Sequence, residues 1–161
     1  MPHQAEDIWQ NTPECQRGGL ESILLPDWVG VNEAWNAPEL EETFAKILKT
    51  REVVTRGIEP LRAEKKVGSS LEVAVYVKSD DTEVLKANAQ DLADIFIVSQ
   101  AHVTETAPAG VLNEYTEDGI TVWVTAAEGE KCERCWKYRK LGEVAGHETV
   151  CTDCAKAVAE L

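Results

Sequence analysis

Four cysteines near the C-terminus constrain the structure of this chain more than any other feature. Cys132-x-x-Cys135 is followed after fifteen residues by Cys151-x-x-Cys154, a spacing typical of zinc sites. Two residues between paired cysteines let a tight turn aim both sulfurs at one ion, and two such turns complete a tetrahedral shell of four sulfurs. A complete shell leaves no position open for catalysis. The sequence therefore predicts one structural Zn²⁺, with Cys132, Cys135, Cys151 and Cys154 as its ligands.

Other roles for these cysteines fit less well. Two disulfides need an oxidising compartment, and the N-terminal residues have neither the basic region nor the apolar core of a secretory signal. Two redox-active pairs would each begin a helix in a strand–helix–strand unit, which is not predicted here. His147 is an alternative ligand. Without a signal or a long apolar run, we expect a cytoplasmic protein that has no membrane contact.

Net charge limits the partners of this chain. The sequence carries 16 basic and 29 acidic side chains, a net charge of −13, which disfavours broad contact with nucleic acid or anionic membranes. The charge is unevenly distributed: residues 67–130 sum to −10, whereas 51–66 sum to +2 and 131–161 to +1. A nucleic-acid partner is therefore expected only at a local basic patch.

One such patch surrounds the first cysteine pair. The run from Lys131 to Lys140 has five basic residues, one acidic residue and two aromatic residues. Basic side chains contact phosphates, and an aromatic ring can stack on an unpaired base. Alternatively, the basic residues offset the −2 charge of a zinc tetrathiolate and the tryptophan covers the turn. The predicted RNA contacts are Arg134, Trp136, Lys137, Tyr138, Arg139 and Lys140.

A second basic stretch lies further toward the N-terminus, between residues 51 and 66. Its basic residues alternate with Glu52, Glu59 and Glu64, so a solvated helix face is the favoured interpretation. The basic members of this stretch are Arg51, Arg56, Arg62, Lys65 and Lys66.

The same region predicts a long amphipathic helix. Asn36 is expected to be its N-cap and Pro38 to lie in the first turn, where the missing N–H does no harm. Gly57 and Pro60 are expected to kink or interrupt the helix. The apolar face comprises Leu40, Phe44, Ile47, Val54, Ile58 and Leu61.

An α+β fold is expected overall, with this amphipathic helical segment, a small domain of mixed strands and helices, and a four-cysteine zinc finger. Alternating apolar residues predict strands at 71–77 and 120–125, and an uninterrupted apolar run predicts a buried strand at 95–98. We expect a short helix over 82–91 and a loop over 104–119.

Several short motifs resemble the C-terminal part of bacterial-type isoleucyl-tRNA synthetases. Gly129-Glu-Lys-Cys-Glu-Arg-Cys-Trp136 with Cys151-Thr-Asp-Cys154 is similar to the zinc finger that ends those enzymes. The stretch Arg62–Val75 contains Lys-Val-Gly-Ser-Ser-Leu-Glu, which resembles their helix-to-strand junction. Ala5–Trp9 and Ile97–Ser99 match in the same order.

The resemblance implies a partition and a function. Residues 1–66 would be the tail of a helical anticodon-binding domain, 67–128 an α+β junction domain and 129–161 the zinc finger. The region would bind isoleucine tRNA near its anticodon, with the body of the synthetase as a further partner. The chain has no His-Ile-Gly-His and no Lys-Met-Ser-Lys-Ser motif, so no catalysis by the chain alone is expected.

A different class of function stays open. A similar finger closes the DNA glycosylases that remove oxidised bases, so the alternative is a zinc-stabilised module for DNA or protein contact. A catalytic glycosylase would need an N-terminal proline followed by glutamate, and here Pro2 is followed by His3.

Overall fold

The computed structural model describes residues 2–27 and 30–159 and has two compact units, which divide between Ala37 and Pro38. The first unit contains helices α1 (Pro2–Asn11) and α2 (Glu14–Arg17) and the 3₁₀ turn η1 (Glu33–Trp35). The Glu6 carboxylate accepts hydrogen bonds from Ser22 Oγ at 2.7 Å and Ile23 N at 3.2 Å. These bonds hold the segment after α2 against α1.

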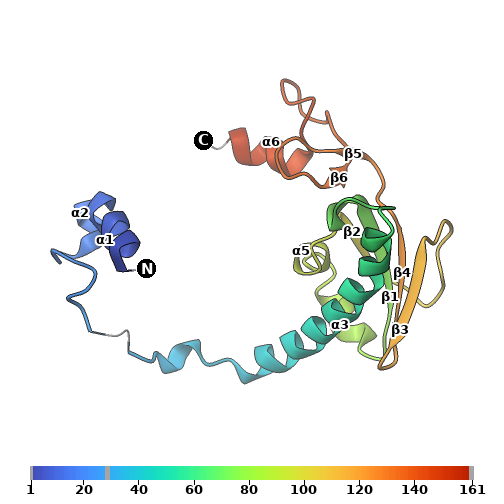
Figure 1. The fold of residues 1–161 in the computed structure, drawn as a ribbon, viewed down its shortest axis with the longest axis horizontal. Coiled ribbons are helices and arrows are strands. Elements are labelled where there is room, and N and C mark those ends of the chain that lie inside the picture. Colours follow the sequence, from blue (N-terminus) through green and yellow to red (C-terminus); the bar gives the residue numbers. More distant parts are fainter. Residues whose placement is uncertain (1, 28–29, 160–161) are drawn as a thin grey trace. The chain divides into compact units, whose positions relative to one another are not determined.

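A four-stranded sheet organises the second unit (Figure 1), with the strand order β2-β1-β4-β3. Strand β1 runs parallel to β2 and antiparallel to β4, which also pairs antiparallel with β3. Helices α4 (Thr82–Ala87) and α5 (Leu92–Ile95) lie in the connection between the two parallel strands, which cannot be joined by a tight hairpin. The strands are β1 (Val73–Lys78), β2 (Gln100–Val103), β3 (Asn113–Glu117) and β4 (Ile120–Ala126).

Helix α3 (Pro38–Ala63) packs against strands β3 and β4 of this sheet. Gly57 faces the sheet, and a Cβ at this position would lie in van der Waals contact with Tyr115 Cβ, at 3.4 Å. Asn113 Nδ2 also donates a 2.7 Å hydrogen bond to the Gly57 carbonyl oxygen. The buried residues of α3 recur every three or four positions, at Ile47, Thr50, Val53, Val54, Gly57, Ile58 and Leu61.

Helix α3 differs from its expected form at both ends. It begins at Pro38, whereas the predicted N-cap Asn36 closes the preceding turn through a hydrogen bond from its N–H to the Glu33 oxygen. The predicted interruption is wrong, because the helix runs through Pro60 to its end at Ala63. Pro60 lies in the last turn, where a missing N–H costs a single hydrogen bond. Leu40 and Phe44, expected on the apolar face, are 55% and 39% exposed.

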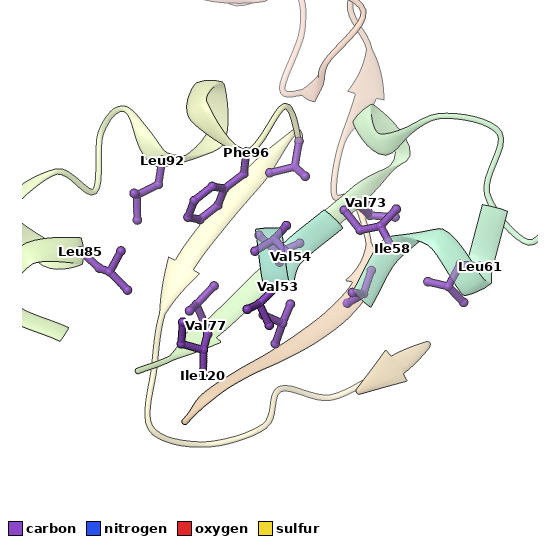
Figure 2. Close-up of a cluster of buried hydrophobic side chains, with 14 of the residues drawn as sticks. Val53, Val54, Ile58, Leu61, Val73, Val77, Leu85, Leu92, Phe96 and Ile120 are labelled. Carbon is purple, nitrogen blue, oxygen red and sulfur yellow. The ribbon is translucent and has the colours of Figure 1, made fainter. Parts of the chain in front are cut away.

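The hydrophobic core lies between one face of the sheet and the helices (Figure 2). Val73, Val75 and Val77 of β1 point into it, since alternate residues of a strand face the same side. Register places Val75 beside Val124 and Val77 beside Val122, so β4 adds its own buried valines to the same layer. Leu85, Leu92 and Phe96 close the core from the connection between β1 and β2.

The apolar run at 95–98 is not a strand, contrary to the prediction. Ile95 ends α5, and Ile97 adopts a left-handed backbone conformation with φ of 57°. The Val98 N–H donates to the Ala93 oxygen, so the run forms the turn that ends the helix. An apolar run without periodicity does not distinguish a strand from a buried helix end.

Two further boundaries differ from the expectation. The predicted helix over 82–91 ends at Ala87 and is followed by the separate helix α5. The predicted loop over 104–119 contains strand β3. Helices and mixed sheets together nevertheless confirm the α+β class. No helix among the described residues has the length and apolar character to cross a membrane.

Candidate metal centre

A small separate sheet carries the first cysteine pair. Strands β5 (Glu130–Lys131) and β6 (Tyr138–Arg139) pair antiparallel, and Cys132 and Cys135 lie in the turn that joins them. The second pair lies at the start of helix α6 (Thr152–Ala159), with Cys151 immediately before the helix and Cys154 in its first turn. A β-bridge between Leu141 and Cys151 brings the two pairs together. We call residues 129–159 the finger.

The four cysteine sulfurs form one compact cluster. All four lie within 4.8 Å of one another, and Cys135 Sγ is 3.9 Å from Cys151 Sγ. A tetrahedral Zn²⁺ site with bonds of about 2.3 Å separates its sulfurs by about 3.8 Å, so the cluster has the dimensions of such a site. His147, the alternative ligand, is not a member of this cluster. The donor chemistry and the geometry fit one structural zinc ion.

The surroundings of Cys132 favour its thiolate, whereas those of Cys135 and Cys151 favour the neutral thiol. Burial would raise the pKa of the Cys132 thiol, but hydrogen bonds from backbone N–H groups, including that of Cys151 at 3.4 Å, hold it at about 6. Burial raises the pKa of Cys135 to about 12 and also raises that of Cys151. A divalent cation offsets the desolvation and repulsion of further thiolates, which is the charge balance that a zinc site requires.

The finger has almost no core apart from these cysteines. Within the described residues, its buried cluster consists of Cys132, Cys151 and Cys154, with Cys135, Leu141 and Val150 packed partly against it. Burial of so few apolar side chains cannot offset the conformational entropy of ordering the segment. Metal coordination is therefore the main source of its stability, as in other small zinc domains.

Polar contacts fix the finger to the α+β domain. Ser99 Oγ accepts a 2.7 Å hydrogen bond from Tyr138 N and donates to the Leu71 oxygen, so it links three segments. Gln100 Nε2 donates to the Tyr138 oxygen at 2.6 Å and to the Glu128 oxygen at 3.1 Å. Gln100 Oε1 accepts a hydrogen bond from Glu128 N at 3.1 Å. Both residues begin or precede β2, so strand β6 is tied to the edge strand of the main sheet.

Three of the predicted RNA contacts are buried or half-buried and contact other parts of the protein. Lys137 is only 9% exposed and forms an ion pair with Asp94, next to the Ser99 and Gln100 contacts. Tyr138 is half-buried, and its backbone makes the contacts with those two residues. Arg139 is half-buried and pairs with Asp153. Although burial opposes the charged form, the Asp153 carboxylate raises the pKa of Arg139.

The other three predicted contacts are exposed to solvent. Trp136 is 62% exposed and has a left-handed backbone conformation with φ of 63°. This conformation directs the chain out of the turn that carries Cys132 and Cys135. Arg134 is exposed, and its Nη1 lies 3.7 Å from Cys154 Sγ, where it can offset thiolate charge. Lys140 is highly exposed and pairs with Glu143 at 2.8 Å. The predicted set thus divides into an inner half, Lys137, Tyr138 and Arg139, and an outer half, Arg134, Trp136 and Lys140.

Sequence reasoning missed two features of this site. Lys131 Nζ lies 5.7 Å from the centre of the Trp136 ring, a cation–π distance, although Lys131 was not among the predicted contacts. The contacts through Ser99 and Gln100 were not predicted either. Lys131 begins the basic run that contains Trp136, which was the available signal for the first feature, whereas the second depends on tertiary structure.

We expect the purified chain to hold one zinc ion and Cys151→Ser to abolish its stoichiometric binding. The finger should then unfold, while residues 38–126 stay folded because their core contains none of these cysteines. Zinc content by elemental analysis and hydrogen exchange along the chain would measure both effects. Cys15→Ser, which removes an exposed free thiol, is the matched control and should change neither. Two metal ions per chain, or a folded finger without metal, would contradict this assignment.

Gly129 provides a test of the pairing between strands β5 and β6. It has φ of 96°, and a Cβ there would lie 2.6 Å from the Arg139 carbonyl oxygen, closer than any real contact allows. We therefore expect Gly129→Ala to separate β5 from β6 and to weaken zinc retention under competition with a chelator. Gly146→Ala is the control, because Gly146 has φ of 83° and open space around it. Equal loss of zinc retention in the two variants would show that backbone strain, and not the contact with Arg139, causes the loss.

Comparison with known proteins agrees with this geometry. Residues 129–157 match the family model described as "Zinc finger found in FPG and IleRS". The isoleucine–tRNA ligase of Syntrophomonas wolfei is 41% identical over 166 residues, which cover 100% of this chain and 18% of the ligase. The ligase of Moorella thermoacetica is 38% identical over 97% of the chain, and that of Nostoc punctiforme 35% over 99%.

This chain spans less than a fifth of the length of those relatives, 17–18% in these three cases. The matched part is the C-terminal end of the ligases. Along its whole length the chain is therefore similar to the C-terminal region of isoleucine–tRNA ligases, and it carries the zinc finger found in FPG and IleRS.

Proposed function

We propose that this chain is the non-catalytic, tRNA-binding C-terminal region of an isoleucine–tRNA ligase and contacts tRNA on the anticodon side. Similarity to that region over the full chain is the observation that carries the proposal. One structural Zn²⁺, bound by Cys132, Cys135, Cys151 and Cys154, would hold the finger in shape. We also propose the partition into 1–66, 67–128 and 129–161, and a cytoplasmic location.

Trp136 is the best candidate for base contact. Its ring is exposed at the outer end of a metal-supported turn, so stacking on a base requires no rearrangement of a core. Lys131 lies near the ring, where its charge can reach the phosphate of a stacked nucleotide. An aromatic ring beside a basic side chain is the common means of holding an unpaired base.

The outer and inner halves of the predicted set have different proposed roles. Arg134 and Lys140, together with Lys131, would contact phosphates, because their charges are accessible to solvent. Lys140 can leave Glu143 at little cost, since an exposed ion pair contributes little. Lys137, Tyr138 and Arg139 would act indirectly, because their contacts with Asp94, Ser99, Gln100 and Asp153 orient the turn.

Such a small basic footprint on a chain of charge −13 implies weak binding. Three phosphate contacts give a slope of about −2 to −3 in a plot of log affinity against log salt concentration. Selectivity for isoleucine tRNA would come mainly from the rest of the synthetase, which we propose as the second partner. The chain alone should discriminate poorly among tRNAs.

A second candidate is a zinc-stabilised module for DNA or protein contact. The description of the finger family supports it, because that finger also occurs in FPG. The match of the remaining residues, 1–128, to isoleucine–tRNA ligases favours the first proposal. Comparing the affinity for tRNA with that for duplex DNA of equal length at one salt concentration would separate the two.

Trp136→Ala should weaken tRNA binding by about 1–3 kcal/mol, the contribution of one stacked base, without loss of zinc. Trp136→Phe, which retains a ring, should recover part of the affinity. The measurement is tRNA affinity at two salt concentrations, with the zinc content of each variant determined in parallel. Salt-independent binding by the unmodified chain, or equal binding by the metal-loaded alanine variant, would contradict the RNA role of the finger.

The chain alone should not catalyse isoleucine-dependent exchange between ATP and pyrophosphate. It contains neither of the two signature motifs that such synthetases use to bind and activate ATP. The assay requires a preparation depleted of the host synthetase, with a buffer blank and an active synthetase as its controls. Exchange that follows the chain through purification would refute this part of the proposal.

A further inference from the structure

A groove runs beside α3, separate from the finger's RNA-contact residues. Its lining residues are Arg51, Thr55, Ile58, Glu59 and Arg62 from one side of the helix, and Ser70, Phe96 and Ile97 from the facing turns. Its volume is about 150 Å³. Ile58 and Phe96 are buried and provide an apolar floor, while Ile97 is 50% exposed at the edge.

Arg51 is the unusual member of this groove. Its Nε is buried and has no hydrogen-bond partner within the described parts of the chain, residues 2–27 and 30–159. Its guanidinium also forms no ion pair with those residues, whereas Arg56 pairs with Glu117 and Lys66 with Glu64. A buried donor without an acceptor is rare in folded proteins, so Arg51 has an unmet hydrogen bond that a water molecule or a ligand oxygen can satisfy.

Arg62 provides a second positive charge. It lies eleven positions after Arg51, a rise of about 16 Å along the helix, and both side chains line the same groove. Arg62 pairs with Glu59 at 2.9 Å, but both side chains are about half exposed, so this pair is weak and can exchange partners. Two arginines and the single carboxylate of Glu59 give the lining a net charge of +1 in an acidic protein.

We propose that this groove binds a segment of single-stranded RNA, with one phosphate at Arg51 and another toward Arg62. The apolar floor and edge would receive the ribose or base between them, since an RNA strand alternates charged and flat, weakly polar groups. The inference depends on the proposed tRNA binding and adds a second contact site to it. The basic stretch 51–66 is interpreted from sequence as a solvated helix face. The inference assigns an RNA contact to two of its residues, Arg51 and Arg62.

Arg51→Gln tests the groove, and Lys49→Gln is its charge-matched control. Lys49 is on the same helix but pairs with Asp118 at 3.3 Å, in the turn between β3 and β4, and does not line the groove. We would measure binding of an isoleucine tRNA transcript by the full chain at about 50 and 200 mM salt. Thermal unfolding and zinc content would establish that each variant is folded.

Loss of one phosphate contact lowers the salt slope by about 0.7. The ratio of wild-type to Arg51→Gln affinity should therefore fall by about 2.6-fold over a fourfold rise in salt. Lys49→Gln should keep the wild-type slope, and Arg51→Lys should restore it in part. The Nε–Hε signal of Arg51 in NMR should shift with tRNA, and with inorganic phosphate only at much higher concentration.

The outcomes separate this inference from the proposed function. Equal slopes for Arg51→Gln and Lys49→Gln, with tRNA binding still sensitive to Trp136→Ala, would overturn the groove and leave the finger's role intact. A shift of the Arg51 signal at equal concentrations of tRNA and free phosphate would also overturn it, because the site would then bind an isolated anion. Absence of tRNA binding by the unmodified chain would refute both.

Discussion

Convergence of four sulfurs on one point is the constraint on which the C-terminal part of this protein depends. The finger has three buried cysteines and few other buried side chains, so it cannot fold by hydrophobic burial alone. Coordination of one ion fixes both turns, and the position of the first turn decides where Trp136 and its basic neighbours lie. The proposed RNA surface therefore depends on metal chemistry, although none of its exposed side chains needs to touch the ion.

Local patterns predicted much of the fold, and non-local contacts account for the differences. The buried stripe of α3 and the strands β1 and β4 follow periodicities that are visible in the sequence. The run at 95–98 has no periodicity, and the left-handed conformation of Ile97 together with the hydrogen bond from the Val98 N–H to the Ala93 oxygen shows that it ends a helix. Strand β3 has a single apolar residue, Tyr115, and forms through pairing with β4.

The candidate site shows the same division. The spacing of the cysteines predicted their cluster, because both pairs are local and their geometry is demanding. Counting charges could not separate Lys137, which pairs with Asp94 forty-three residues away, from the exposed Arg134. It also could not single out Arg51, whose character comes from a groove that three segments of the chain build together. Sequence indicates which charges exist, and tertiary structure decides which of them are free.

The attachment of the finger through Ser99 and Gln100 has a consequence for the evolution of such modules. The coordinating cysteines are contained within the finger, but the residues that orient it belong to its host. Transfer of residues 129–159 to another scaffold would carry over the metal site but not the contacts that orient the finger. Related fingers in unrelated hosts would then share their metal chemistry and differ in the direction they face.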